Sequence, residues 1–493
     1  MSDYIHIPST VGLQEIVNNN FSLSSSQYVK LVMPNKNYKF VSEFLWRSLT
    51  QGDLGEEIGS LNYIDKSPYL FIRTKALQEQ SFLPDFNKES ALPIMPSEFV
   101  QMNLKEGDLL ISKDSNIGEI VILDKDYPDS MLSGAIYRLP VKEEWRYYLL
   151  AFIKHRIFRE QLDFMVPKGA TIRHAKTKFL DCKIPLPNKN KEYVVRYISL
   201  LTQAIVSKEK IIRQRHSLIS QLIEKELMAN QNLNDFIYKL PRLSEIEDLG
   251  RLDSGVYGVM LKKNIHLIKN YTGGYFQLDE SMIGGGSTPK IRYVGNESDL
   301  KYQWVTPSFC SDYGTLTECR INFQGTNNIN KNAILIINRT SKGGLGEFVG
   351  ISGYYDYSEL GEGQHNQGMY RVDVFDENKL LFILCCLNCK IYRQICAALS
   401  VGSKMKELKT TQIAMIPFPI FPTNKQKEIT DLYRNPQEYD TEGFSLDNFL
   451  VKDNEYNSTA GIYELDKTAK YLKDKLNKAI DDIVNDREVE IGF

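Results

Sequence analysis

The sequence lacks the features that mark membrane-spanning or secreted proteins. Its longest purely apolar run, Leu380 to Leu387, is far shorter than the ~20 residues of a membrane helix. The N-terminal stretch MSDYIHIPST has neither a basic leader nor an apolar core. Seven cysteines, an odd number scattered through 493 residues, do not form a disulfide pattern. We therefore expect a cytoplasmic protein without structural disulfides.

A charge excess of either sign is also missing. The chain has 60 Lys and Arg residues against 62 Asp and Glu residues, a formal net charge of -2. Because no global basic field marks a nucleic-acid-binding protein, any such binding relies on local patches or on a partner subunit. The length predicts two or three domains.

The motifs of several enzyme classes are incomplete. No Gly-Lys-Ser/Thr follows Gly284 to Gly286, which excludes a P-loop. The segment NPQE, residues 435–438, lacks the second proline and the aromatic residue of an N-P-P-[FY] adenine-methyltransferase motif, and no F-x-G-x-G loop occurs. Pro84 and Asp85 lack the strand-borne E-x-K of a nuclease site. We therefore expect no catalytic residues and no cofactor.

The sequence does not predict a metal site either. Cys385, Cys386, Cys389 and Cys396 lie in an apolar, helix-like segment, so we interpret them as buried structural thiols. His174 and His365 have no Cys, Asp or Glu at ligand spacing.

A long helix is predicted over residues 190–228. Its apolar residues recur at alternating steps of four and three, the heptad pattern of a helix that packs along another helix, with Lys208 and Arg215 on the same seam. Such a helix spans roughly 50 Å at 1.5 Å per residue and acts as a spacer. A matching strip recurs from Ile462 to Ile483, so we predict that the two helices pack together. The alternative, that each helix lies alone on its own domain, remains open.

The chain contains an internal repeat. SLSSSQY at 22–28 corresponds to RLDSGVY at 251–257, and the segment 109–123 corresponds to 334–351, with Gly118 paired with Gly346. Both of the latter segments predict strand, turn and strand. Six such landmarks keep one order at offsets of about 230 residues, so we infer a duplicated mixed α/β unit. The polar stretch 434–459 is interpreted as an insertion or loop.

Apolar-helix landmarks complete the repeat. Residues 148–162 correspond to 382–395, and each half then reaches an I-P-L-P or I-P-F-P strand that leads into a helix. Together with GGGSTPK at 284–290 and WVTP at 304–307, this order resembles the specificity subunit of type I restriction-modification systems. The resemblance extends from about Phe21 to about Asp486. No single motif decides it; their order, which occurs twice, does.

The resemblance implies an α+β architecture, with two mixed α/β target-recognition domains joined by long heptad helices that form an antiparallel coiled coil. We assign residues 1–188 to the first recognition domain, 189–232 to the spacer helix, 233–423 to the second domain, and 424–493 to a second helical region. The insertion leaves open whether the coiled coil is shortened or asymmetric.

The resemblance also implies the function. Each domain would read one half of a split double-stranded DNA target, and two methyltransferase (M) subunits, with restriction (R) subunits in addition, would join the complex. Heads separated by 50 Å would meet sites about 15 base pairs apart. The seam residues assigned to helix pairing and partner docking are Val194, Ile198, Leu201, Ile205, Ile212, Ile219, Leu222, Ile462, Leu465, Leu472, Leu476 and Ile483.

Basic and amide side chains in predicted loops are the candidate DNA contacts, because Lys and Arg bind phosphate, Arg reads guanine, and Asn and Gln read adenine. In the first half they are Lys113, Asn116, Arg138, Lys168, Thr171, Arg173, His174, Lys176 and Lys178. In the second half they are Arg339, Lys342, Gln364, His365, Asn366, Gln367, Arg371, Ser403, Lys404 and Lys406. A solvated polar loop without a ligand would have the same composition.

Two other classes of function remain open. A stand-alone methyltransferase or nuclease fused to its own reader is disfavoured by the incomplete motifs. A coiled-coil scaffold would explain the helices but not the duplicated globules with basic loops.

Overall fold

The computed structural model describes residues 4–18, 21, 23, 28–165, 176–287, 302–317, 320–321, 328–340, 348–402 and 405–493. The chain divides into two compact units. Unit 1 comprises Met1–Lys210, Tyr439–Asn457 and Lys467–Phe493, and unit 2 comprises Ile211–Glu438 and Ser458–Asp466. The predicted domain boundaries stay predictions, because this division follows compactness and assigns half of the long helix to each unit.

Unit 1 contains short strands, a pair of bent helices and half of the long helix. Its strands are β1 (Ile5–His6), β2 (Lys30–Leu31), β3 (Tyr38–Phe40), β4 (Leu70–Ile72), β5 (Ala91–Pro93), β6 (Leu109–Ser112), β7 (Ile120–Ile122), β8 (Ser130–Leu132), β9 (Ile136–Leu139) and β10 (Lys183–Pro185). Its helices are α1 (Leu13–Asn18), α2 (Arg146–Lys154), α3 (Arg156–Met165) and the first half of α4 (Lys191–Ala229). Two C-terminal helices contribute most of their residues as well, α12 (Phe449–Thr459) and α13 (Ile462–Val484).

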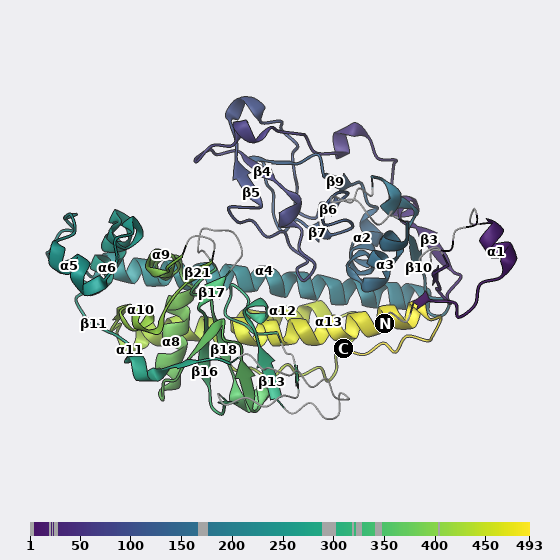
Figure 1. Ribbon diagram of the computed structural model, residues 1–493. Helices are drawn as coiled ribbons and strands as arrows, with labels where there is room; N and C mark the ends of the chain where they lie inside the picture. The colour runs from purple at the N-terminus through teal and green to yellow at the C-terminus, as the bar shows by residue number, and fades with distance from the viewer. Residues whose placement is uncertain are drawn as a thin grey trace. The chain divides into compact units, whose positions relative to one another are not determined.

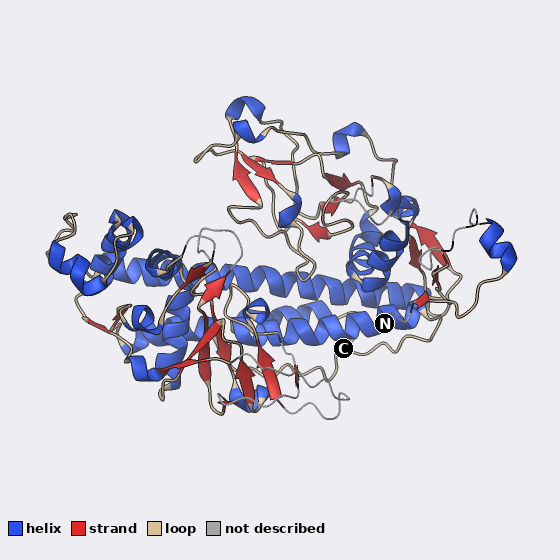
Figure 2. Cartoon of the chain, viewed as in Figure 1, coloured by secondary structure: helices blue, strands red, loops and turns tan. Residues whose placement is uncertain are grey.

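Unit 2 has the same kinds of element in a similar order. Its strands are β11 (Tyr275–Phe276), β12 (Ile283–Gly285), β13 (Tyr302–Val305), β14 (Arg320–Ile321), β15 (Asn328–Ile329), β16 (Ala333–Ile337), β17 (Arg339–Thr340), β18 (Ser352–Tyr355), β19 (Gly363–His365), β20 (Met369–Val372), β21 (Lys406–Glu407) and β22 (Phe418–Pro419). Its helices are α5 (Leu243–Leu249), α6 (Val259–Lys269), α7 (Tyr357–Leu360), α8 (Glu377–Asn388), α9 (Lys390–Leu399), α10 (Thr410–Ala414) and α11 (Thr423–Tyr433). Figure 2 shows how short the strands are beside α4 and α13.

The predicted strand, turn and strand is confirmed in both units as the centre of a sheet. In unit 1 the order is β7-β6-β9, and in unit 2 β16 lies between β18 and β20, with β12 at the edge. The central strands β6 and β16 are buried along their whole length, as expected for runs of Leu and Ile covered on both faces. Leu110 pairs with Arg138 in the first sheet, and Leu335 pairs with Arg371 in the second.

The glycine that precedes the second strand corrects one detail of the predicted repeat. Gly118 and Gly350, not Gly346, are the equivalent positions. Each has a positive φ and donates its backbone N–H to the carbonyl oxygen of the last residue of the central strand. A Cβ on Gly118 would lie 2.4 Å from Leu162 of α3, and one on Gly350 would lie 2.6 Å from Cys396 of α9. Both sites therefore require glycine for conformation and for close helix packing. Gly346 lies outside the described residues.

The apolar helix predicted in each half is two helices. The chain bends between α2 and α3 at His155, and between α8 and α9 at Cys389, where both residues adopt the extended conformation. The α8 to α9 bend is 73°. Tyr148 donates to the carbonyl oxygen of Pro185 (2.7 Å) and Tyr392 to that of Pro417 (2.9 Å), so each pair is tied to its proline strand.

The four cysteines near this bend are buried, as predicted. Burial raises the pKa of the Cys389 and Cys396 thiols to about 12. Among the described residues, no single helix is long and apolar enough to cross a membrane. Taken together, the bent pair α8 and α9 has the length and composition of a membrane span. Its apolar side chains, however, are buried inside unit 2.

Helices α4 and α13 pack side by side and antiparallel in unit 1 (Figure 1). Asn188, just before α4, bonds to Asp486, just after α13 (2.6 Å), whereas Glu209 further along α4 pairs with Lys473 (2.8 Å). Ile198, Leu201 and Ile205 are buried in the same core cluster as Leu472 and Leu476. The predicted pairing of the two helices is therefore confirmed.

The stretch 434–459 was expected to be a loop or insertion, but it also contains the helix α12. Its two ends meet in unit 2: Asn435 donates its backbone N–H to Glu464 (3.0 Å) and its side-chain amide to the carbonyl of Thr459 (2.9 Å). Helix α11 thus ends beside the start of α13. The two ends of the insertion therefore lie next to each other, where α11 ends and α13 begins.

Candidate nucleic-acid interface

The two sheet arginines predicted to contact DNA occupy equivalent places and are engaged within their own units. Arg138 donates to the carbonyl oxygen of Met102 (3.0 Å) and lies 3.6 Å from the Asp108 carboxylate. Arg371 donates to the carbonyl oxygen of Asn328 (2.6 Å) and pairs with Asp373 (3.1 Å). Because Arg138 holds the segment of Met102 and Arg371 holds strand β15, both arginines have structural partners that base contact would have to replace.

The turn between β6 and β7 presents one predicted residue to solvent. Asn116 is exposed, and the turn reaches it through Ser115, which has a positive φ of 63°. Lys113 is half-buried, with its ammonium 3.7 Å from Asp114. Asn116 is therefore better placed than Lys113 to contact a ligand.

The segment GEGQHNQG, predicted as a polar loop, is partly a buried strand. Gln364 and His365 belong to β19, which pairs with β13 and β15, and they are 2% and 1% exposed. Gln364 donates to the Asn328 side chain (2.5 Å). The loop placement is therefore wrong for both residues. They are consecutive on β19 and point to opposite faces of its sheet, so both faces are covered by protein there.

Burial also sets the charge of His365. Desolvation, with the nearby Arg371 charge, lowers the pKa of His365 to about 4, so its ring is neutral at pH 7. Neither ring nitrogen has a hydrogen-bond partner in the part of the chain that the structure describes. A neutral buried imidazole is not available to pair with phosphate.

Asn366 and Gln367 lie in the turn after β19. The Asn366 side chain accepts from the backbone N–H of Gly368 (2.7 Å), which stabilises the turn. Gln367 is exposed and accepts, through its carbonyl, a bond from Asn338 (3.0 Å). The Gln367 side chain is thus presented to solvent on a rigid turn.

The ribbon of β17 and β21 brings Arg339 and Lys406 into one element. The strands are antiparallel, with Arg339 opposite Glu407 and Thr340 opposite Lys406. Arg339 pairs with Glu407 at 3.2 Å, so the ribbon carries one neutralised arginine and a half-buried lysine.

The basic turn of the first half is described only at its end. Lys176 is exposed with a positive φ of 50°, and exposed Lys178 donates to the carbonyl oxygen of Met165 (2.8 Å). The other predicted basic-loop residues lie outside the described residues: Lys168, Thr171, Arg173, His174, Lys342, Ser403 and Lys404.

The seam residues predicted for both helix pairing and partner docking are mostly buried within the chain. Val194, Ile212, Ile219, Ile462, Leu465 and Ile483, together with the seam residues already named in the unit 1 core, are at most 5% exposed, and Leu222 is half-buried. They are therefore occupied by packing within the chain, as expected for helix pairing, and the docking role assigned to them stays a prediction.

The sequence model described as "Type I restriction modification DNA specificity domain" matches residues 46–214 and again 276–433, most of the chain. The chain belongs to this family. The two matched segments coincide with the two halves of the internal repeat, so the protein carries two DNA specificity domains. The resemblance inferred from the sequence and the DNA-recognition function that it implies are thereby confirmed.

Solved structures give only a distant likeness. A crystal structure of a type I restriction-modification system S subunit from M. genitalium is 13% identical, covers 92% of this chain and 97% of its own, and has a TM-score of 0.36. The HsdS subunit from Thermoanaerobacter tengcongensis is 12% identical with a TM-score of 0.27, covering 92% and 98%. No match was found among curated proteins.

Two features of the domains escaped the sequence reading. The first is a buried ion pair between Lys208 of α4 and Asp453 of α12, whose ammonium and carboxylate are 2.7 Å apart. The second is a pocket formed around α6, a helix of unit 2 that precedes the second specificity domain. For the pocket, the available sequence signal was the unequal spacing of the repeat landmarks in that region.

Proposed function

We propose that this chain is the non-catalytic DNA-reading subunit of a type I restriction-modification complex, acting in the cytoplasm. Each specificity domain reads one half of a bipartite double-stranded target. The observation that carries the proposal is the presence of two DNA specificity domains in one chain. The incomplete methyltransferase and nuclease motifs support a division of labour in which partner chains perform the chemistry.

Helix α4 supports a fixed spacing between the two half-sites. It runs without a break for 39 residues, about 58 Å at 1.5 Å per residue, and contributes to both units. A continuous helix transmits position from one reader to the other more faithfully than a flexible linker.

The partners in the proposal are two methyltransferase (M) subunits, with restriction (R) subunits added for cleavage. One similar solved structure is described as "Structural basis underlying complex assembly andconformational transition of the type I R-M system", with 12% identity, a TM-score of 0.29, and coverage of 94% of this chain and 100% of that one. Those words concern the complex of another protein. For this chain, the partners are proposed from the family to which it belongs.

The proposed DNA contacts follow the exposed polar positions. Asn116, Lys176 and Gln367 are exposed, whereas Gln364 and His365 are removed because they are buried. From the residues outside the described ranges we retain Lys168, Thr171, Arg173, His174, Lys342, Ser403 and Lys404 as predicted contacts. Replacing Arg173 should weaken recognition by about 1 to 3 kcal/mol if it contacts a base.

Co-expression with the M subunit tests the proposal. We would map N6-methyladenine by long-read sequencing in cells that carry both chains. A split motif with a fixed unread gap is expected, and replacing one specificity domain with that of a relative should change one half of the motif only. A continuous motif, or methylation by this chain alone with labelled S-adenosylmethionine, would contradict the proposal.

A further inference from the structure

The second half of the repeat contains a helix that the first half does not have in the same place. Tyr28 precedes Tyr38 of β3 by ten positions, whereas Tyr257 precedes Tyr275 of β11 by eighteen. Helix α6 lies within this longer interval, between the two segments that match the family. The shared domain architecture therefore does not account for α6.

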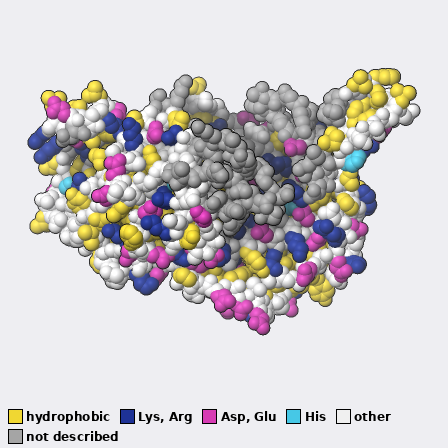
Figure 3. All heavy atoms as spheres, turned by 60° about the horizontal axis from the view of Figure 1, so that its bottom comes forward, with side chains coloured by type: hydrophobic (Ala, Val, Ile, Leu, Met, Phe, Trp, Pro, Cys, Tyr) yellow, Lys and Arg dark blue, Asp and Glu magenta, His cyan; other side chains and the backbone are white. Residues whose placement is uncertain are grey.

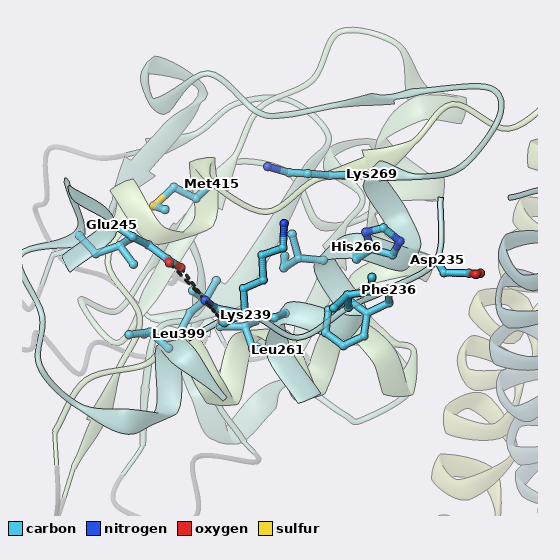
Figure 4. Close-up of a pocket in the computed structure, with 14 residues that line it drawn as sticks. Asp235, Phe236, Lys239, Glu245, Leu261, His266, Lys269, Leu399 and Met415 are labelled. Carbon is cyan, nitrogen blue, oxygen red and sulfur yellow. Dashed lines mark hydrogen bonds and ion pairs between the residues drawn. The ribbon is translucent and has the colours of Figure 1, made fainter. Parts of the chain in front are cut away.

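Helix α6 is fixed on one side and leaves a hollow on the other. Leu261, Asn264 and Ile268 are buried, and Asn264 donates to Gln394 of α9 (3.0 Å). On the other side, the segment before α5 is tied to α6, because Lys262 donates to the carbonyl oxygen of Lys239 (3.2 Å). The resulting pocket has a volume of about 590 Å³ (Figure 4).

The lining of this pocket combines an apolar floor with basic side chains. Phe236, Ile237, Leu249, Val256, Leu261, Ile265, Leu399 and Met415 supply the apolar surface. The charged and titratable residues are Asp235, Lys239, Glu245, Lys262, His266 and Lys269. A pocket with this composition binds an apolar group that carries a negative charge.

One of the lysines is available for such a charge. Lys262 is paired with Glu245 (3.0 Å), and Lys269 lies over the Tyr275 ring at 5.4 Å from its centroid. Lys239 is exposed, and its ammonium has no hydrogen bond or ion pair with any residue that the structure describes. Figure 4 shows its side chain extending toward the middle of the pocket.

Exposed apolar side chains continue beyond the pocket along the same stretch of chain. Leu233, Leu240, Leu243, Leu252 and Met260 are between 58% and 104% exposed. Apolar surface of this extent marks a protein contact, because a single small molecule in the pocket would leave these side chains in water.

We propose that the pocket around α6 and its apolar surroundings dock an acidic, apolar segment of one modification subunit. An apolar side chain of that segment fills the pocket, and a neighbouring carboxylate pairs with Lys239. This inference rests on the proposed function and names a docking surface apart from the helix seams. Since the first half has no counterpart of α6 at this place, the two modification subunits are held unequally.

The test uses full-length chains carrying Lys239→Glu or Ile237→Asp. Both side chains are exposed, so neither change removes core packing. Lys263→Glu is the matched control, because it makes the same charge change on α6 at an exposed position outside the pocket lining. Binding of the purified modification subunit is measured by calorimetry, and the stoichiometry of the complex by native mass spectrometry.

We expect Lys239→Glu and Ile237→Asp to weaken the binding of one modification subunit by about tenfold, so that one-to-one complexes accumulate. Lys263→Glu should keep the wild-type stoichiometry. Equal assembly by all variants overturns the inference, as does a loss of DNA binding with normal assembly. Stabilisation of the wild type by dodecanoate, lost in Lys239→Glu while assembly is unchanged, would assign the pocket to a small amphipathic carboxylate. If the wild-type chain fails to bind the subunit at all, the proposed function itself fails.

Discussion

At the residue scale, Arg138 illustrates how a side chain typical of DNA contact can serve the fold. It lies on β9 with its guanidinium on the carbonyl oxygen of Met102, and Arg371 repeats the arrangement with Asn328. Two equivalent arginines that each donate to a backbone carbonyl of a neighbouring segment point to a role in holding the fold of each domain. Residue type alone does not distinguish this role from base reading.

Replacing Arg138 should therefore affect stability first. We expect Arg138→Gln to lower the free energy of unfolding by about 1 kcal/mol, because the Met102 carbonyl loses its charged donor. Asn116→Ala, at an exposed position, should change it by less than about 0.5 kcal/mol. Chemical denaturation of both variants measures this. A fully stable Arg138→Gln variant whose complex with the modification subunit methylates a different motif would return Arg138 to the DNA contacts.

Asp53 provides a pH-dependent test in unit 1. It is 2% exposed, and although burial favours the neutral carboxyl, the hydrogen bonds from Arg47 and Thr50 outweigh it and lower its pKa to about 2. A carboxyl whose pKa is lower in the folded than in the unfolded state stabilises the fold above pH 3.8, and this stabilisation is lost as pH falls toward 2.

We therefore expect Asp53→Asn to reduce stability at pH 7 by about 2 kcal/mol, and the difference from wild type to shrink below pH 4. Thermal unfolding at a series of pH values measures the difference. Asp447→Asn is the control, because its ion pair with Arg196 is largely exposed and contributes little. A difference that stays constant down to pH 2 would show that the Asp53 charge is not the cause.

At the scale of elements, a buried ion pair joins α4 to α12, and its lysine lies on the predicted seam of α4. Lys208 is fully buried, and its ammonium contacts Asp453 (2.7 Å) and Asn457 (2.6 Å) beneath the rings of Tyr439 and Tyr456. Tyr439 in turn donates to Asp453 (2.7 Å). A buried charge at one seam position fixes the register between helices, since a shifted helix would leave it without a partner.

Removing one member of this pair should cost much more than removing both. We expect Lys208→Met to destabilise unit 1 by about 3 to 5 kcal/mol, because Asp453 is left buried without its cation. Adding Asp453→Leu should restore most of the loss. A double-mutant cycle by chemical denaturation measures the coupling. A loss below about 1 kcal/mol in the single variant would show that water reaches the carboxylate.

At the scale of the whole molecule, the near-zero net charge limits DNA binding by the chain alone. Figure 3 shows Lys and Arg side chains interspersed with Asp and Glu over much of the described surface of one face. Such a surface releases few counterions when it meets a duplex. The isolated chain should therefore bind weakly, with a dissociation constant of about 1 to 100 µM at ~150 mM salt.

Fluorescence anisotropy with a labelled duplex measures this affinity. Adding the modification subunit should increase both affinity and sequence preference, because the partner contributes further phosphate contacts. Nanomolar, sequence-specific binding by the isolated chain would contradict the expectation and remove the need for partners in recognition.

The sequence by itself determined the duplication, the buried strands β6 and β16, and the helices α4 and α13. These follow from local periodicity and from the order of motifs, which the linear chain contains in full. The family followed from the same order, because the two halves repeat it with their spacing nearly intact.

The tertiary structure decided which polar residues remain available. Gln364 and His365 are buried because protein covers both faces of the sheet at β19, and Arg138 is engaged because the fold brings the Met102 carbonyl oxygen to its guanidinium. The bend at His155, the return of the insertion at Asn435 and the pocket beside Lys239 likewise depend on contacts between segments distant in sequence. Periodicity encodes which face of an element is apolar, whereas the partner of a polar group depends on what the fold places against it.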